Sequence, residues 1–392
     1  MNQLTPTFAS WRVVQAGTRE VIDAIVAPEH RGPSPELAAG LRQWKGAHYW
    51  PGRDHGHLIL VRETGVSAKR ERWILHLLLF SVTVLCTLGA GAMLAGAWFP
   101  PNGPSLIGGS QNLLGRIVFE MAGMVQAGGQ FFQSMYNGDW RDVLAGWSFA
   151  VPLLGILMIH ELGHYFAARR YAIDTSPPFF LPIPPTVSPI GSLGAFIRLR
   201  SPVLDRRQLL DVGAAGPLAG FVIALGVMIW GYMTSERVPF GLETSATYVV
   251  FAGRSIALGD SVLTHAFRDF FFPAAEAVHL SLPAFAGWVG MFVTGLNLLP
   301  LSQLDGGHVL YGLLGKRQSF MGLITLGALI VLAQYHWTWY VWVALALAVG
   351  GGRVSHPSVM VPERSVPRSR HVVAWLCIIV FILTFVPIPF KV

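Results

Sequence analysis

Six stretches of this sequence are long enough to cross a lipid bilayer as a helix and carry almost no acidic or basic side chain. They are residues 73–99, 143–171, 212–235, 277–304, 318–352 and 371–390. A spanning helix needs about 20 mostly apolar residues. Charged residues make up 12% of the chain and hydrophobic residues 53%, whereas about a quarter of a soluble domain is charged. The sequence therefore predicts a multi-pass membrane protein.

The stretch 318–352 determines how many spans are expected. Its 35 residues are long for one crossing and short for two, at about 1.5 Å per residue. We expect a tight hairpin around His336–Thr338. The predicted fold class is then an all-α polytopic membrane protein with about seven transmembrane helices.

Basic residues are distributed unevenly between the apolar stretches. They cluster just before Trp73, over residues 169–207 and between residues 316 and 370, whereas the loops 100–142 and 236–276 carry fewer. Loops rich in Lys and Arg stay in the cytosol. We therefore expect a cell-membrane protein with a cytoplasmic N-terminus.

This pattern also predicts the domain organisation and the partners. The expected parts are an N-terminal cytosolic segment (1–72), a first transmembrane helix (73–99), an extracytoplasmic loop (100–142), a catalytic core (143–315) and a C-terminal transmembrane region (316–392). The net charge of +7 is explained by orientation in the lipid bilayer, so we expect no nucleic-acid partner.

The run His160-Glu161-Leu162-Gly163-His164 is the most informative motif. Residues i and i+4 share one face of a helix, so both imidazoles can bind one metal ion. Glu161 beside them can accept a proton from a water molecule that the metal activates. The 17 uncharged residues 143–159 place His160 about 25 Å along the helix. Ionisable groups at such depth are costly and usually functional.

A catalytic zinc ion uses three protein ligands and keeps one position for water, so one more ligand is needed. Asp305 is the strongest candidate, because it ends a predicted span and precedes two glycines that allow a sharp turn. Pro300 interrupts the helix before it, which is tolerated where the chain lines a cavity. We expect one Zn²⁺ per chain. Membrane metallopeptidases of the prenyl-protein type use a glutamate instead, for which Glu276 would be the candidate.

Two motifs together resemble the site-2 proteases, a family of membrane-embedded zinc peptidases. They are H-E-L-G-H at 160–164 and N-L-L-P-x-x-x-L-D-G-G-H at 297–308. The resemblance implies that Asp305 completes the zinc site. It also implies that Asn297 helps to hold the substrate or the oxyanion; a helix–helix hydrogen bond is the alternative. Many members have a proline just before the Leu-Asp-Gly, where this chain has Ser302-Gln303.

The resemblance extends to the segment between the catalytic helix and the next span. Gly191-Ser-Leu-Gly194-Ala-Phe196 follows a proline-rich stretch and resembles the membrane-embedded, β-like re-entrant loop of the family. We expect a strand with a free edge there, to which an extended substrate could add. Gly191, Gly194 and Phe196 are the predicted substrate-binding residues. Small residues over 213–216 would let the following helix approach closely.

The resemblance implies an intramembrane zinc metalloprotease that cleaves in or near transmembrane segments of membrane-protein substrates, as in regulated intramembrane proteolysis. A catalytically inactive relative, acting as a membrane chaperone or receptor, would lack a ligand or the base, and all four residues are present. A metal transporter would need a polar path across several helices, which the uncharged runs do not provide.

Overall fold

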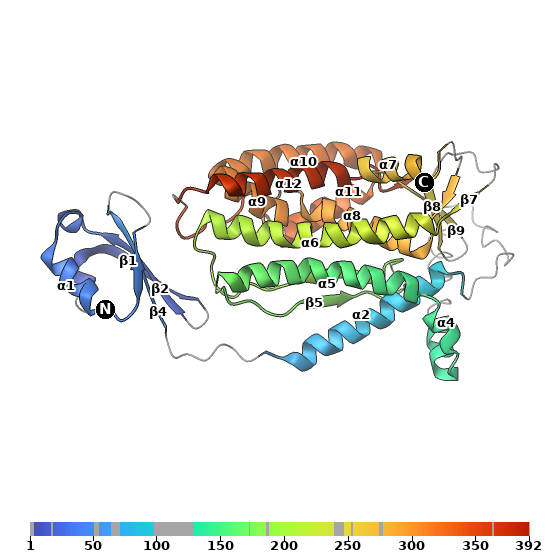
Figure 1. Ribbon diagram of the computed structural model, residues 1–392, viewed down its shortest axis with the longest axis horizontal. Helices are drawn as coiled ribbons and strands as arrows, with labels where there is room; N and C mark the ends of the chain where they lie inside the picture. The colour runs from blue at the N-terminus through green and yellow to red at the C-terminus, as the bar shows by residue number, and fades with distance from the viewer. Residues whose placement is uncertain are drawn as a thin grey trace.

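The chain forms an N-terminal domain built on a β-sheet and a bundle of long helices, seen lengthwise in Figure 1. This computed structural model describes residues 4–16, 19–50, 55–63, 71–97, 129–171, 173–185, 188–238, 247–251, 254–273, 277–362 and 364–391. We call the end of the bundle that faces the N-terminal domain the domain end, and the opposite end the sheet end (Figure 1).

The N-terminal domain is an antiparallel sheet of four strands in the order β1-β2-β4-β3. Its elements are η1 (Thr5–Thr7), β1 (Phe8–Ala16), β2 (Arg19–Val26), η2 (Pro28–His30), α1 (Pro35–Gln43), β3 (Ala47–Tyr49) and β4 (His57–Glu63). Alternation of side chains along a strand gives the sheet two apolar faces. One face packs on Leu37 of α1 through a cluster that includes Ile22 and Leu58. The other carries Val21 and Ile59.

The expectation of an all-α fold is therefore wrong for residues 1–72. Its apolar residues fall in short strands between charged residues, and the strands pack apolar side chains on both faces of the sheet.

Ten helices of the described part of the chain are named in the bundle. They are α2 (Trp73–Leu94), α4 (Trp140–Leu144), α5 (Trp147–Arg170), α6 (Arg206–Met233), α7 (Val262–Phe271), α8 (Leu282–Asn297), α9 (Asp305–Leu314), α10 (Gln318–Tyr335), α11 (Thr338–Val349) and α12 (Arg368–Thr384), with η3 (Gly315–Arg317) between α9 and α10. The core is formed by α5, α6 and α8, which pack on one another, while α2 lies against α5 and α12 against α6 and α8.

Four described helical segments are long and apolar enough to cross a membrane: α2, α5, α6 and the continuous stretch Asp305–Tyr335. The helices α8 and α11 are apolar but shorter. The predicted break near His336–Thr338 is confirmed, because α10 ends at Tyr335 and α11 begins at Thr338. Residues 100–128 of the predicted loop 100–142 lie outside the described part of the chain.

A five-stranded sheet covers the sheet end of the bundle, in the order β11-β9-β8-β10-β7. Its strands are β7 (Glu236–Val238), β8 (Thr247–Phe251), β9 (Arg254–Leu258), β10 (Ala277–His279) and β11 (Phe390–Lys391). The β8–β10 pair is parallel and the other pairs are antiparallel. This sheet is a second departure from the all-α expectation, since it joins short segments that are far apart in the sequence.

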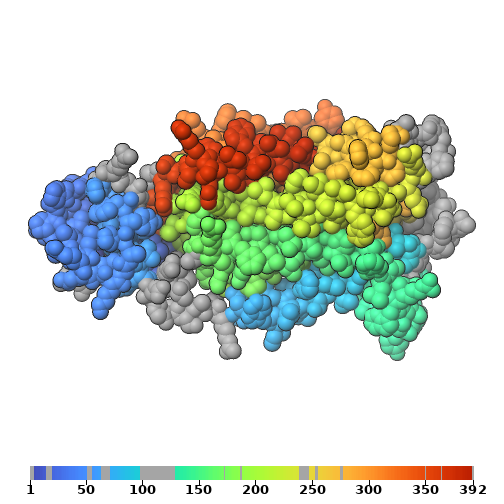
Figure 2. Space-filling view, in the orientation of Figure 1, coloured from blue at the N-terminus to red at the C-terminus, as the bar shows by residue number. Residues whose placement is uncertain are grey.

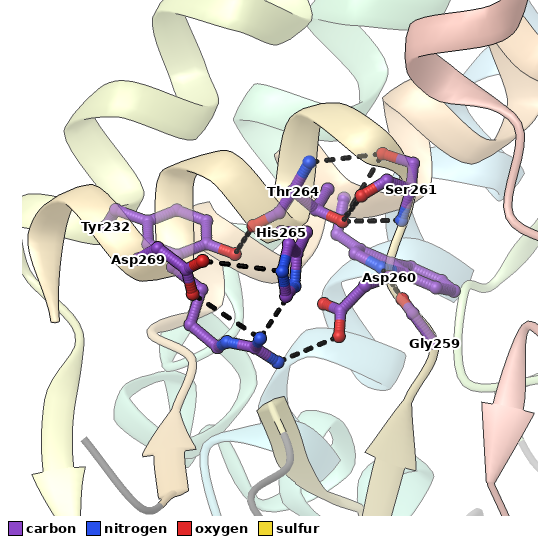
Figure 3. A network of polar contacts seen from close by, with 9 residues as sticks. Tyr232, Gly259, Asp260, Ser261, Thr264, His265 and Asp269 are labelled. Carbon is purple, nitrogen blue, oxygen red and sulfur yellow. Dashed lines mark hydrogen bonds and ion pairs between the residues drawn. The ribbon is translucent and has the colours of Figure 1, made fainter. Parts of the chain in front are cut away.

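The helix α7 is fastened to the end of α6 by the polar contacts in Figure 3. Ser261 and Thr264 form a capping box at its N-terminus, and the hydroxyl of Tyr232 donates to the carbonyl of Thr264 at 3.3 Å. Arg268 pairs with Asp260 at 2.9 Å. These bonds satisfy polar groups that the apolar surroundings would otherwise leave unpaired.

A short hairpin lies beside α2 and α5. Its strands β5 (Phe179–Pro182) and β6 (Ser192–Phe196) pair antiparallel. His76 at the start of α2 stacks on Phe179 with ring centroids 4.0 Å apart, and Glu71 pairs with Arg200 through both carboxylate oxygens. The predicted strand in this region is confirmed, and it ends at Phe196.

Candidate metal centre

The helix α5 places three ionisable side chains in its buried interior. His160, Glu161 and His164 are each no more than 6% exposed, and one ligand atom of each lies within 4.8 Å of the others. Their spacing of one helical turn gives the two histidines a common face. This arrangement confirms that the motif forms a cluster able to hold a metal ion.

Asp305, the first residue of α9, meets the two histidines from across the bundle. Its Oδ2 lies 3.3 Å from Nε2 of His160 and its Oδ1 lies 3.3 Å from Nε2 of His164. The two Nε2 atoms are 3.2 Å apart. Ligand atoms about 2.0 Å from a tetrahedral zinc ion lie about 3.3 Å from one another. The three side chains therefore fit three corners of such a site.

The charges of this cluster also favour a cation. Glu161 and Asp305 are two carboxylates in a buried site, and the ion pairs of Asp305 in the described part of the chain are to the two imidazoles alone. Buried carboxylates are costly unless they are paired or coordinate a metal. A divalent ion between them would remove that cost.

The remaining atoms of the cluster are oriented by backbone groups. Nδ1 of His164 lies 2.7 Å from the carbonyl of Val212 on α6, and since a carbonyl only accepts, Nδ1 carries the proton and Nε2 is free to bind a metal. The backbone N–H of Ile197, just after β6, stabilises the carboxylate of Glu161 electrostatically. The hairpin therefore reaches the group that would act as the base.

Small residues on α6 make room for the imidazoles. A Cβ atom at Gly216 would overlap the ring of His164, and one at Gly220 would lie 3.0 Å from Nδ1 of His160. Gly163 of α5 faces the backbone of Ala215 equally closely. The predicted close approach of the span that contains 213–216 is confirmed.

Asn297 lies at the last residue of α8, next to the metal cluster. Its Nδ2 is 3.3 Å from Nε2 of His160, and the residue is half-buried. Its amide therefore faces the space beside the cluster rather than a neighbouring helix backbone. The position agrees with a role in holding a substrate carbonyl.

The loop between α8 and α9 is tightly folded. A Cβ atom at Gly306 would overlap the carbonyl of Leu298, so glycine is required for the close turn that presents Asp305. Ser302 in the loop has a positive φ of 40°. His308, at the end of the second motif, contacts His356, with Nδ1 of His308 2.8 Å from Nε2 of His356.

The three predicted substrate-binding residues occupy different environments. Gly191 has a φ of 74°, and a Cβ there would overlap the backbone of Cys86 on α2, so this glycine is needed for packing. Gly194, with a φ of 105°, faces open space. Phe196 is 44% exposed and stacks on Phe179 at 5.5 Å. Only Gly194 and Phe196 are therefore open to a ligand.

Other residues that matter here carry no sequence signal. Ile197 and Val212 contribute through their backbones, which any residue type could do. His356 and Gln318, discussed below, belong to no motif. The alternative ligand Glu276 lies outside the described residues.

A cluster of two histidines and two carboxylates inside a bundle of apolar helices is typical of a metal site in a membrane protein. The chain also resembles known proteins. Residues 148–334 match the model of peptidase family M50. Over these residues the chain is similar to this family, that of the site-2 proteases, and its long apolar helices agree with a membrane protein.

Two plant proteins illustrate the similarity. The chain is 27% identical over 250 residues to the "Probable zinc metalloprotease EGY2, chloroplastic" of Oryza sativa subsp. indica, covering 62% of this chain and 42% of that protein. It is 32% identical over 209 residues to the "Probable zinc metalloprotease EGY1, chloroplastic" of Arabidopsis thaliana, covering 53% and 34%. The chain thus spans less than half the length of these relatives.

A solved structure is also similar in part. The "Site-2 Protease from Methanocaldococcus jannaschii" matches with 16% identity and a TM-score of 0.28, over 59% of this chain and 85% of that chain.

Proposed function

We propose that this chain is a zinc metalloendopeptidase of the site-2 protease type that cleaves peptide bonds in or near transmembrane segments of membrane proteins. The observation that carries the proposal is the arrangement of His160, His164 and Asp305 at mutual distances of 3.2–3.3 Å, with Glu161 beside them. These three would hold one Zn²⁺ and leave its fourth position open.

Each side chain has a defined part in the reaction. Zinc, when bound, lowers the pKa of a water molecule towards neutrality. The carboxylate of Glu161 would accept a proton from the attacking water molecule while the oxygen of that water bonds to the peptide carbonyl carbon. Asn297 donates its amide to the oxygen that becomes negative. The proton then passes from Glu161 to the leaving amine nitrogen as the C–N bond breaks.

The hairpin and the groove beside α5 provide places for a membrane-protein substrate. In the described part of the chain β6 pairs only with β5, and its second edge is free. An extended segment of a substrate can add to that free edge near Gly194 and Phe196. An apolar groove of about 440 Å³ runs between α2, α4 and α5, on the face of α5 that carries Met158. A transmembrane helix of a substrate could lie in this groove.

We further propose about seven spans and a cytoplasmic N-terminus, and the direction of the helices supports this orientation. In Figure 1, α5 ends and α6 and α12 begin at the domain end. The basic residues Arg169, Arg170 and Arg370 lie at these helix ends, and basic ends face the cytosol. The hairpin β5–β6 would then be the membrane-embedded re-entrant loop. We place the protein in the cell membrane, with the lipid bilayer as its surroundings.

The physiological role follows by analogy with the family. Release of cytosolic domains by regulated intramembrane proteolysis is the role we propose. The alternatives are an inactive relative that acts as a membrane chaperone or receptor, and a metallopeptidase of the prenyl-protein type. The first is disfavoured by the presence of the base and of all three ligands, and the second by the position of Asp305 between the histidines.

Replacement of the base and of the third ligand separates these functions. Glu161→Gln should retain one zinc per chain yet lose cleavage of a transmembrane reporter, because only the proton acceptor is removed. Asp305→Ala should lose zinc, whereas Glu276→Ala should keep it. Metal content is measured by mass spectrometry of purified protein. Cleavage by the Glu161→Gln variant, or zinc loss with Glu276→Ala alone, would contradict the proposal.

A further inference from the structure

The loop that precedes Asp305 is tied to a distant segment of the chain. Residues 354–361, which we call the strap, lie between α11 and α12. The backbone N–H of Ser302 in the loop donates to the carbonyl of Val354 at 2.9 Å. The strap therefore begins in direct contact with the loop that presents the metal ligand.

Gln318, at the start of α10, bonds to the loop and to the strap at once. Its side-chain amide donates to the carbonyls of Pro300 and Val354 at 3.1 and 3.4 Å. Its oxygen accepts from the backbone N–H of His356 at 2.9 Å. The residue is 1% exposed, so these bonds have no competition from water, and losing them leaves buried groups unsatisfied.

The middle of the strap lies on α9, one turn beyond Asp305. Nδ1 of His356 is 2.5 Å from the carbonyl of Pro357, which can only accept. Burial lowers the pKa of His356, so its imidazole is neutral and its Nε2 accepts from Nδ1 of His308 at 2.8 Å. The ring of Tyr311 packs 4.8 Å from that of His356.

The far end of the strap is covered by the N-terminal domain. Met360 and Val361 pack in one cluster with Val21 and Ile59 of the sheet. Figure 2 shows the domain against this end of the bundle. Just beyond the strap, Arg364 completes the contact.

The guanidinium of Arg364 connects the domain to α6. It lies 5.8 Å from the ring of Tyr49 on β3 and 2.7 Å from a carboxylate oxygen of Asp205. Asp205 in turn caps the N-terminus of α6 through the N–H of Gln208 at 2.9 Å. The N-terminal domain therefore contacts the bundle through apolar packing and through the guanidinium of Arg364, which lies between Tyr49 and Asp205.

We propose that the strap positions Asp305 for metal binding and that the N-terminal domain holds the strap in place. Asp305 is the first residue of α9, so its carboxylate is located by the loop before it and the helix after it. The strap bonds to both. The proposal rests on the proposed function only in taking Asp305 as a metal ligand. Gln318, His356 and Arg364 are then positioning residues that never touch the substrate.

The test compares matched glutamines in the full-length protein, in lipid nanodiscs and in the Glu161→Gln background. Gln318→Ala should speed hydrogen exchange over residues 298–308 and 354–361. It should also speed zinc loss to a chelator about 10-fold, as expected when a partner of a ligand is removed. Gln334→Ala is the control, because this glutamine lies on the same helix and bonds only to Ile330 and Tyr340. It should change neither.

A second pair of variants tests the domain. Arg364→Ala should speed exchange of the strap and zinc loss, by less than Gln318→Ala. Arg62→Ala removes a similar contact, 5.6 Å over Trp44, inside the domain and away from the strap, and should affect neither. Unchanged zinc loss with Gln318→Ala overturns the positioning role, and an Arg364→Ala variant identical to its parent overturns the role of the domain.

The outcomes also separate this inference from the proposed function. A parent protein that binds no zinc refutes the proposed function. The exchange rates of residues 298–308 then still decide whether the strap holds the loop, since they need no metal.

Discussion

The two halves of α5 pack in opposite ways. Towards the domain end its neighbour is the backbone of α6, with Gly216 beneath the ring of His164. Towards the sheet end its neighbours are large rings: Phe149 stacks on Phe285 at 5.5 Å, and Phe285 on Trp288 at 6.0 Å. In the half towards the domain end, the backbone of α6 lies against the ligand side chains and fixes their position. In the half towards the sheet end, large side chains fill the space between the helices. We call these the metal half and the aromatic half. A substitution in the metal half should therefore act by displacing a metal ligand, and one in the aromatic half by removing packing contacts.

The largest effect is expected from Gly216→Ala. The added methyl group would overlap the ring of His164, and α6 cannot retreat without losing its contacts with α5. A misplacement of about 1 Å in a site of this kind costs on the order of 100-fold in rate. We expect loss of cleavage and of bound zinc, measured in parallel on purified protein.

Gly226→Ala is the matched control for this prediction. Gly226 lies on the same helix, and a Cβ atom there meets nothing within 4 Å. Alanine also has the better helix propensity, so activity and zinc content should stay at the level of the parent. If both variants retained zinc equally, the close contact between the ring of His164 and the backbone of α6 at Gly216 would not be needed to position the ligands.

A smaller effect, of a different kind, is expected from Phe285→Ala. Phe285 is 3% exposed within the aromatic half. Its removal leaves a cavity, and because lipid is as apolar as the core, mainly packing energy is lost, about 2 kcal/mol. Thermal unfolding in detergent should occur at a lower temperature, while zinc per chain stays at one.

The control for that variant is Phe320→Ala on α10, which is 65% exposed and has little packing to lose. If Phe285→Ala emptied the metal site at a temperature where the protein is folded, the two halves of α5 would not be independent.

The metal half of the molecule was largely predictable from the sequence. The spacing of His160 and His164 is a property of one helix, so a local pattern suffices. Asp305 could be proposed from its place at the end of a span and before two glycines, but the resemblance of the second motif was needed to connect it with the histidines, because no local rule connects residues 145 positions apart. The contact between Asn297 and His160 could likewise be expected only from the resemblance of the second motif.

The sheets and the strap were not predictable, for different reasons. Strands such as β7 and β10 have three residues each and pair across about 40 positions, so neither has a period of its own to detect. The close packing of Gly191 was not predictable either, because its closest neighbour is the backbone of Cys86 on another helix. His356 and Gln318 act through hydrogen bonds that any loop histidine or helical glutamine could make.

The smallest effect expected is a pH dependence at the attachment of α2, on the side of the hairpin that reaches Glu161. Arg200 bonds to both carboxylate oxygens of Glu71 and holds the pKa of that carboxyl below its usual value. A lowered pKa in the folded state means that the bond stabilises the protein fully above the unfolded value of about 4.5 and less as pH falls below it. Because the pair is partly exposed, with 21% and 19% of the two side chains accessible, its contribution should be about 1 kcal/mol or less.

Arg200→Ala should therefore lower the unfolding temperature slightly at pH 7, and the difference from the parent should shrink towards pH 4. A difference that is the same at both values of pH would mean that Arg200 acts through packing, and the hairpin would then be held to α2 by the stacking of His76 on Phe179.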